Sequence, residues 1–415
     1  MVKQGYKQTE IGAIPNDWNC TRFGEKVKIY RGGSPRPIQY YLTGASYGIN
    51  WIKIGDVREN DKYISSTQEK IIPEGVSKSR EVHVGDFILS NSMSFGRPYI
   101  LNIDGCIHDG WLTIQEYKNT FSTEYLYYLL SSNIVYQQYI SMAAGSSVKN
   151  LNKDKVSALT VIYPDIAEQE RIAEALSDVD SMVSSLEKLI TKKKAVKQGA
   201  MQELITGKKR LPGFDGDIKY KSLASLCAVF ADGDWIESKD QSNDGIRLIQ
   251  TGNIGVGKYL DKTDKQRFIS TDTFDRLKCL EIFENDVIVS RLPEPAGRAC
   301  ILPYSNKRRI TAVDCTIIRF ADYNPILFVA YSQTKQYQDK VDMAMAGSTR
   351  QRISRKELGE IPIPVFPTIE EQNALASTFS DMDSEIEALE QKLEKTRQIK
   401  QGMMQQLLTG KIRLV

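Results

Sequence analysis

A long segment of this chain occurs twice, and this repeat constrains the fold more than any other feature. Residues 164–211 align with residues 367–414 at a constant offset of 203 without a gap, and 23 of the 48 aligned positions are identical. Both copies carry Glu-Gln near their start and end in Lys-Gln-Gly-x-Met-Gln-x-Leu-Ile/Leu-Thr-Gly-Lys. A chain built in two such copies is expected to serve two similar partners, or one partner with two similar halves.

Apolar residues recur in both copies at alternating steps of four and three, the heptad pattern of a helix with one long apolar seam. The pattern predicts helices over 166–205 and the matching part of the second copy. Because each seam must be covered, we expect an antiparallel coiled coil with a globular part at each end. The alternative is that each helix packs on its own domain. The seam residues are Ile172, Leu176, Val179, Val183, Leu186, Ile190, Leu375, Phe379, Met382, Ile386, Leu389 and Leu393.

Each helix carries signals at both ends. Gly207 and Gly410 stand where a C-terminal cap is expected. Gly199 and Gly402 lie inside the helices, where glycine costs about 1 kcal/mol relative to alanine. Their recurrence predicts that a neighbouring backbone approaches closely at that point. At the start of each helix we expect a capping box, formed by Asp165 with Glu168 and by Thr368 with Glu371.

The segments between the long helices repeat more weakly. Residues 51–57 resemble 248–254, residues 84–90 resemble 284–290, and residues 18–33 align with 218–233 in their apolar positions. The first two pairs read as apolar strands with turns. A recurring framework with diverged intervening residues suits a reader of two different sequences. We therefore predict an α+β protein with a pseudo-two-fold repeat, in which two mixed α/β domains, 1–163 and 212–366, alternate with helical regions 164–211 and 367–415.

The composition limits the class of protein but does not identify what the protein binds. No apolar run approaches the roughly 18 residues of a membrane span, and six scattered cysteines favour a reduced, cytoplasmic protein. The net charge of +3 does not indicate nucleic-acid binding as a strongly basic domain would. It does not exclude such binding either, because a nearly neutral chain can separate its charges between faces.

The sequence lacks the usual patterns of catalysis. Its two histidines, His83 and His108, both lie in the first half and are not repeated in the second. A histidine-based triad or metal site is therefore not expected. Neither a phosphate-binding loop nor a dinucleotide fingerprint occurs, so we expect no bound metal or cofactor and no catalysis by this chain.

Recognition is expected in loop stretches rich in Gly, Ser, Arg, Tyr and Asn. Arginine can bridge guanine, asparagine suits adenine, and lysine and serine can hold phosphates. The alternative is that these residues form turns and a solvated surface. Candidate DNA-binding residues in the first half are Ser34, Arg36, Tyr40, Tyr41, Asn91, Ser92, Ser94, Arg97, Ser147 and Lys149. In the second half they are Asp234, Trp235, Arg291, Arg298, Ser348, Thr349, Arg350 and Arg352.

These motifs resemble the specificity subunit of type I restriction–modification enzymes. The resemblance rests on the Glu-Gln start and Lys-Gln-Gly…Thr-Gly-Lys end of both helices, and on the stretches 12–18 and 32–35; it covers the whole chain in the same order of parts. It implies two target-recognition domains that each read half of a split double-stranded DNA site, with the helices as the ruler between them.

The resemblance also implies partners. Two modification subunits, which methylate adenine with S-adenosylmethionine, and restriction subunits, which use ATP and Mg²⁺, would dock on this chain, and this subunit itself would hold no cofactor. Two other hypotheses stay open on the residues alone. One is a non-catalytic coiled-coil adaptor that presents two protein-binding modules. The other is an enzyme such as a fused methyltransferase, which the missing cofactor motif disfavours.

Overall fold

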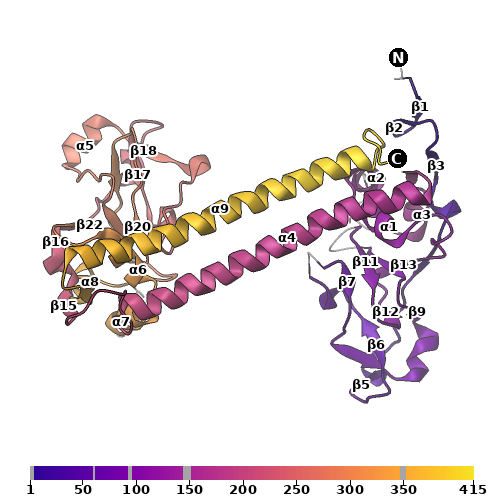
Figure 1. Ribbon diagram of the computed structural model, residues 1–415, viewed down its shortest axis with the longest axis horizontal. Helices are drawn as coiled ribbons and strands as arrows, with labels where there is room; N and C mark the ends of the chain where they lie inside the picture. The colour runs from indigo at the N-terminus through magenta and orange to yellow at the C-terminus, as the bar shows by residue number, and fades with distance from the viewer. Residues whose placement is uncertain (1–3, 59–60, 92–95, 144–150, 346–351) are drawn as a thin grey trace. The chain divides into compact units, whose positions relative to one another are not determined.

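The computed structural model describes residues 4–58, 61–91, 96–143, 151–345 and 352–415 (Figure 1). The chain divides into two compact units, residues 1–186 with 392–415, and residues 187–391. Each unit holds one mixed α/β domain and one part of each long helix. None of the described helices is both long and apolar enough to cross a bilayer.

The described part of the first unit contains two larger sheets. The first has the order β4 (Lys28–Arg31), β13 (Trp111–Gln115), β10 (Phe87–Ser90), β11 (Pro98–Leu101) and β7 (Tyr63–Ile64). The second has the order β5 (Leu42–Thr43), β8 (Glu69–Ile71), β6 (Ile49–Ile52), β12 (Gly105–Ile107) and β9 (Arg80–Val82). Smaller pairs are β1 (Tyr6–Thr9) with β2 (Gly12–Pro15), and β14 (Thr160–Tyr163) with β3 (Asn19–Arg22). The helices of this domain are α1 (Thr123–Leu130), α2 (Asn133–Ala143) and α3 (Lys153–Ser157).

The second unit repeats this plan in its described part. One sheet has the order β16 (Cys227–Asp232), β22 (Cys315–Phe320), β19 (Val287–Ser290) and β20 (Ala299–Ile301). The other has the order β18 (Arg267–Ile269), β17 (Ile246–Ile249) and β21 (Arg309–Thr311), and β15 (Lys219–Ser222) pairs with β23 (Pro362–Val365). Its helices are α5 (Thr271–Leu277), α6 (Pro325–Ser332), α7 (Lys335–Met345) and α8 (Arg355–Glu360).

Both units also contain short 3₁₀ helices. Those of the first unit are η1 (Phe23–Glu25), η2 (Ile38–Tyr40), η3 (Ile54–Asp56) and η4 (Pro73–Lys78). Those of the second unit are η6 (Leu223–Leu226), η7 (Ser238–Asp240), η8 (Thr251–Asn253) and η9 (Thr263–Lys265).

The strand orders show that the two domains share one topology. The order β4-β13-β10-β11 of the first corresponds to β16-β22-β19-β20 of the second, and β8-β6-β12 corresponds to β18-β17-β21. The turns before β10 and β19 also match, because Gly85 and Asn285 both adopt positive φ, of 90° and 67°. The internal repeat predicted from the sequence is therefore confirmed at the level of the fold.

One alignment from the sequence needs a correction. We aligned 18–33 with 218–233 at an offset of 200, but the matching glycines are Gly32 and Gly233, whose N–H groups donate to Trp111 and Cys315 on the equivalent strands β13 and β22. The offset grows to 201 because β16 carries a bulge between Cys227 and Val229. A bulge inserts one residue without ending the strand, so the apolar pattern alone did not reveal it.

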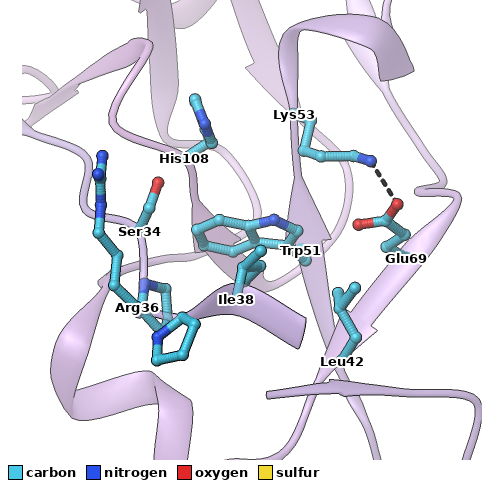
Figure 2. A pocket seen from close by; sticks show the side chains of 10 residues that line it. Ser34, Arg36, Ile38, Leu42, Trp51, Lys53, Glu69 and His108 are labelled. Carbon is cyan, nitrogen blue, oxygen red and sulfur yellow. Dashed lines mark ion pairs between the residues drawn. The ribbon is translucent and has the colours of Figure 1, made fainter. Parts of the chain in front are cut away.

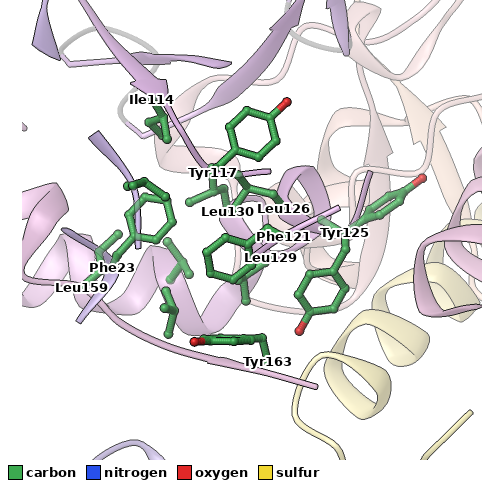
Figure 3. Packing of buried hydrophobic residues seen from close by; sticks show 14 of the residues in the cluster. Phe23, Ile114, Tyr117, Phe121, Tyr125, Leu126, Leu129, Leu130, Leu159 and Tyr163 are labelled. Atoms are coloured by element: carbon green, nitrogen blue, oxygen red, sulfur yellow. The ribbon is translucent and has the colours of Figure 1, made fainter. Parts of the chain in front are cut away.

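The core of each domain extends into the long helices. In the first unit, aromatic residues of α1 and its neighbours pack in one cluster with Phe23 and Tyr163 (Figure 3). Ile172 and Leu176 of the first long helix belong to the same cluster. The equivalent cluster of the second unit includes Leu375 and Phe379. The N-terminal part of each seam therefore packs on its own domain, which is the alternative that the sequence left open.

The long helices also pair with each other inside each unit. Helix α4 spans Ile166–Ala200 and continues as a single π-helical turn, Met201–Ile205, and α9 spans Ile369–Leu407. In the first unit Lys400 pairs with Asp180 at 2.6 Å, and in the second Lys197 pairs with Asp383. In each case the late part of one helix lies beside the early part of the other, so the helices run antiparallel within each unit.

Two expectations about the helix interiors and starts are wrong. An added Cβ at Gly199 or Gly402 would meet no atom within 4 Å, so no described backbone approaches these exposed glycines. The N-caps form as predicted, since Glu168 N–H donates to Asp165 at 2.9 Å and Glu371 N–H donates to Thr368 at 3.2 Å. The two glutamates do not close capping boxes, however, because their carboxylates bind arginines instead. At the C-terminal ends, Gly207 and Gly410 adopt φ of 75° and 66°, as a glycine cap requires.

Candidate functional site

The loop after β4 forms a polar cluster around Asp109. Its carboxylate accepts from Ser34 Oγ at 2.9 Å, lies 3.0 Å from His108 Nε2, and lies 3.5 Å from Arg36 Nη2. His108 Nδ1 accepts from the Gly110 N–H at 3.0 Å, so His108 cannot serve as the base of a triad in this arrangement. Burial would raise the pKa of Asp109, but the Ser34 hydrogen bond and the neighbouring cations lower it overall. The cluster holds the loop while the Arg36 side chain stays 80% exposed.

A pocket of about 730 Å³ opens beside this cluster (Figure 2). Its lining includes Trp51, which is 1% exposed and whose ring centre lies 5.9 Å from that of His108 in an edge-on arrangement. An ion pair of 2.6 Å between Lys53 and Glu69 closes one side. The pocket is lined by Ser34, Pro35, Arg36, Pro37, Ile38, Leu42, Trp51, Lys53, Glu69 and His108. Of these, sequence reasoning had singled out only Ser34 and Arg36 for DNA binding.

Tyrosines near the first loop differ in exposure. Tyr40 is 78% exposed, as a side chain that contacts a ligand would be. Tyr41 is half-buried, its hydroxyl hydrogen-bonds the Lys78 ammonium, and that ammonium lies 4.9 Å from the Tyr41 ring centre. Tyr40 is therefore the more accessible of the two candidates.

Asn91 and Arg291 occupy equivalent positions and make equivalent contacts. The Asn91 amide donates to the Asp109 carbonyl at 3.0 Å, and the Arg291 guanidinium donates to the Val313 carbonyl. Both side chains are at most 5% exposed. Burial lowers the pKa of Arg291, and the carboxylate of Asp232 at 3.2 Å acts in the opposite direction. This geometry gives both residues a structural role, and DNA contact by either stays a prediction.

Arg298 is still more fully engaged with its own chain. Its guanidinium donates to the carbonyls of Ile254 at 2.7 Å and Thr251 at 3.0 Å, next to η8. It also donates to three carbonyls of the following loop, those of Leu292 at 2.9 Å, Pro293 at 3.3 Å and Pro295 at 3.0 Å. Burial lowers the pKa of Arg298. All three guanidinium nitrogens thus donate to backbone carbonyls, which gives Arg298 a structural role in this arrangement.

The remaining described candidates of the second domain differ in role. Trp235 is 70% exposed. Asp234 accepts from the Leu280 N–H at 3.0 Å, and burial raises its pKa. Arg352 pairs with Asp314 at 2.9 Å and stays 31% exposed. Trp235 is therefore the most accessible of these side chains.

Some candidates cannot be placed. Ser92, Ser94, Ser147, Lys149, Ser348, Thr349 and Arg350 lie outside the described residues. Arg97 is described and half-buried. Within the described ranges no group of three or more His, Cys, Asp or Glu side chains could hold a metal ion.

The glutamate near the start of each long helix pairs with an arginine beyond the end of the other long helix, a contact that the sequence analysis did not predict. Glu168, 2% exposed, accepts from Arg413 at 2.6 Å and from the Trp18 indole at 3.1 Å. In the other unit Glu371, 1% exposed, accepts from Arg210 at 2.6 Å. The sequence did contain a signal for these pairs, because each arginine and each glutamate recurs at the offset of 203.

The glutamine of each Glu-Gln pair contacts the mixed α/β domain of its own unit instead. Gln169 Oε1 accepts from the Ser122 N–H at 3.0 Å, directly before α1. Gln372 Oε1 accepts from the Asn324 N–H at 3.3 Å, directly before α6. The Glu-Gln pair thus joins each domain to the long helix that follows it and to the end of the other long helix.

The predicted seam residues are all buried or half-buried. Those buried are Ile172, Leu176, Leu186, Ile190, Leu375, Phe379, Ile386 and Leu393, and those half-buried are Val179, Val183, Met382 and Leu389. On the exposed side of α4, Lys193 and Lys194 pair with Glu385 and Glu390 of α9 at 2.6 Å.

Comparison with known proteins places these features in context. The family model described as "Type I restriction modification DNA specificity domain" matches residues 15–198 and 216–398. A putative type I restriction enzyme MjaX specificity subunit from Methanocaldococcus jannaschii is 24% identical over 99% of this chain and 97% of its own length. The MjaVIII specificity subunit of the same organism is 21% identical over the same shares.

Solved structures share the fold. A chain from a study of complex assembly and conformational transition of the type I R-M system superposes with a TM-score of 0.64 at 16% identity, covering 96% of this chain and 99% of that one. The S subunit of a type I system from M. genitalium gives a TM-score of 0.55 at 13% identity over 94% of this chain and 96% of its own. The HsdS subunit from Thermoanaerobacter tengcongensis gives 0.50 at 17% identity over 96% and 98%.

Proposed function

Because this chain belongs to the family of type I restriction–modification DNA specificity proteins, we propose that its two domains each read one half of a bipartite, asymmetric site in double-stranded DNA. The chain is accordingly the specificity subunit of such a system and is itself non-catalytic.

One observation carries this proposal. The two domains have the same strand order, yet they expose different side chains at equivalent places. The Gly33 and Asp234 N–H groups make the same hydrogen bond, to the carbonyls of Ile107 and Thr311, and the next residue is Ser34 in one domain and the exposed Trp235 in the other. A shared scaffold with different residues in the equivalent loops suits two unlike half-sites.

We further propose that two modification subunits and the restriction subunits dock on this chain. The support is the repetition of the helix-end contacts, Arg210 with Glu371 and Arg413 with Glu168, which gives each unit the same arrangement of the helix ends. Two copies of one partner would match this repeated arrangement. The S-adenosylmethionine, ATP and Mg²⁺ needed for methylation and cleavage would be held by those subunits.

Methylome sequencing tests the proposal. The chain is expressed with its modification subunit in a host that lacks adenine methylation, and the modification subunit alone is the control. We expect a bipartite motif methylated at adenine only when both proteins are present. Unchanged methylation with a modification subunit of proven activity would contradict the proposal.

The dependence of DNA affinity on salt separates this function from that of a protein adaptor. Phosphate contacts release counterions, so the affinity of the assembled modification complex for its site should fall steeply as salt rises. An adaptor that binds only proteins would show no such affinity.

A further inference from the structure

A row of three residues crosses the small sheet of the second domain. Phe268 on β18 is the register partner of Arg247 on β17, and Arg247 is the register partner of Arg309 on β21. Leu248 and Ile310, the next residues on β17 and β21, pack into an apolar cluster on the opposite face. Side chains alternate between the faces of a strand, so the two arginines lie side by side on the same face.

Both arginines are buried without an adequate anionic partner. The Arg247 side chain is 7% exposed, and its Nη2 atom is buried without a hydrogen bond. Its Nη1 makes only long contacts, 3.3 and 3.4 Å, with two carbonyls. Arg309 is 5% exposed, and with the residues that the structure describes its guanidinium forms neither a hydrogen bond nor an ion pair. Like charges on adjacent strands are unfavourable, and buried charges need partners.

The carboxylates nearby do not balance this charge. Asp261, 54% exposed, lies 3.9 Å from Arg247 Nη2, beyond hydrogen-bond distance. Asp286 and the exposed Glu284 attract Arg309 without forming an ion pair with it, and Asp286 is held by Arg319 through two hydrogen bonds of 2.7 Å. A third cation, Lys307, lies 5.4 Å from the centre of the Phe268 ring on the same row.

A hydroxyl group completes the arrangement. Tyr259 is half-buried, and burial raises the pKa of its hydroxyl. The positive charges of Arg247 and Arg309 act in the opposite direction and lower this pKa. The two guanidinium groups on this face supply several donors, and the Tyr259 phenol lies within their electrostatic influence. Planar guanidinium groups match the oxygens of a phosphate in geometry as well as in charge.

We propose that Arg247 and Arg309, with Tyr259 beside them, form an oxyanion site that binds a phosphate group in the second recognition domain. The phosphate could come from the DNA backbone, in which case the inference rests on the proposed function, or from a free phosphate. The site belongs to the second domain alone. At the equivalent places the first domain has Asn50, whose amide donates to the Asp104 carbonyl at 2.8 Å, and Gly105.

Thermal unfolding of the full chain tests whether the site binds phosphate. Inorganic phosphate is compared with sodium chloride at equal ionic strength in a zwitterionic buffer. At roughly 100-fold excess over its dissociation constant, phosphate should raise the Tm of the second unit by about 5 °C. Arg309→Met and Arg247→Met should abolish this rise.

The sign of the effect without phosphate distinguishes an anion site from ordinary packing. Removing one of two like, poorly paired buried charges relieves their repulsion, so Arg309→Met should unfold at a higher Tm than the unaltered chain in phosphate-free buffer. Arg309→Lys keeps the charge and should retain part of the phosphate response. The matched control is Arg308→Met, which removes the neighbouring cation from an exposed pair with Glu281 at 2.8 Å and should leave the phosphate response intact.

Binding of DNA by the chain with its modification subunit identifies the source of the phosphate. If the DNA backbone supplies it, Arg309→Met should reduce the slope of log affinity against log salt by about one, while Arg308→Met leaves the slope unchanged. A phosphate-dependent Tm rise with an unchanged slope assigns the site to a free phosphate. If the complex bound no DNA while phosphate still raised the Tm, the proposed function would fail and the site would stand. The site is refuted if Arg309→Met changes neither the phosphate response nor the slope.

Discussion

At the scale of single residues, a charged side chain in a recognition domain can hold the fold instead of the ligand. Arg298 donates to five backbone carbonyls that join η8 to the loop 292–295. Because Arg298→Met leaves these acceptors without their donor, we expect it to lower the free energy of unfolding by roughly 2–4 kcal/mol. Denaturant unfolding of the full chain measures the loss.

The control for this prediction is Arg267→Met. Arg267 is exposed and has one long side-chain contact, 3.4 Å to Gln241, so its replacement should change stability by less than about 0.5 kcal/mol. Equal effects of the two variants would show that the carbonyl contacts of Arg298 do not stabilise the domain.

Asp17 supplies a prediction about pH. The hydrogen bond from Arg413 holds the pKa of Asp17 below its ordinary value of 3.8. A lowered carboxylate pKa stabilises the fold above the unfolded value, and this contribution is lost as pH falls through the folded pKa. Asp17→Asn should therefore lower the Tm slightly near pH 7, and this difference should shrink at pH values below 3.8, since Asp17 is 66% exposed and the pair is screened by solvent. A constant difference between these pH values would contradict this account.

Residue roles were the part that sequence reasoning predicted least. Arg36 lies between two prolines and Arg298 follows a glycine, so the sequence predicts a loop position for both. In the structure, the Arg36 side chain is 80% exposed, whereas Arg298 donates to carbonyls of residues that are distant in the sequence. The difference arises because the fold brings residues 251–254, which follow a strand of a different sheet, beside residue 298. No local pattern reports such contacts, so the candidate list mixed accessible side chains with structural ones.

At the scale of elements, the two long helices are held at their ends by arginine–glutamate pairs. Arg210→Met would leave Glu371, 1% exposed, as a buried charge without its cation, so we expect a loss of about 3 kcal/mol. The double variant Arg210→Met/Glu371→Met removes both charges and should recover much of that loss. A double-mutant cycle by denaturant unfolding measures the coupling.

The equivalent pair in the other unit provides the comparison for this cycle. Arg413→Met should act in the same direction through Glu168, which also accepts from the Trp18 indole. Purely additive single and double variants in both units would show that the pairs are not coupled and that the helix ends are held by apolar packing.

Gly199 and Gly402 yield a prediction of opposite sign. Both are exposed, lie within helices and have open space where a Cβ would be. Alanine at each position should therefore raise the free energy of unfolding by about 0.5–1 kcal/mol. Lower stability of either variant would show that a Cβ at that position meets a neighbouring atom.

The same glycine variants test where partners dock. If a modification subunit approaches the helix at these glycines, the alanine variants should bind it more weakly although the chain itself is more stable. The Lys192→Ala variant, on the same exposed face of α4 but with a side chain already present, is the matched control. Unchanged affinity of the glycine variants places the docking surface elsewhere.

Helices were predictable because their signals are local and repeated. The heptad steps and terminal glycines predicted α4 and α9, and the structure differs mainly in the π turn at Met201–Ile205. The capping boxes failed because Arg210 and Arg413 compete for the glutamates from far along the chain. Short strands such as β7 and β5, of two residues each, carry no periodicity from which a sheet order could be derived.

At the scale of the whole molecule, the two recognition domains are proposed to read half-sites whose separation depends on the helices. Exchange of residues 212–366 for those of another family member should therefore change one half of the methylated motif and preserve the other half and the gap. Methylome sequencing of the exchanged chain measures this directly. A change in both halves would show that the two domains do not read independently.

The length of the helices supplies the last prediction. Seven residues inserted into α4 preserve the heptad phase of its seam, but they leave the seam of α9 out of register unless α9 receives seven as well. Seven helical residues add about 10.5 Å, which corresponds to roughly three base pairs of duplex. The doubly extended chain should thus methylate a motif with unchanged half-sites and a gap about three base pairs longer, whereas extension of α4 alone should destabilise the chain. An unchanged gap in the doubly extended chain would show that the helices do not set the spacing.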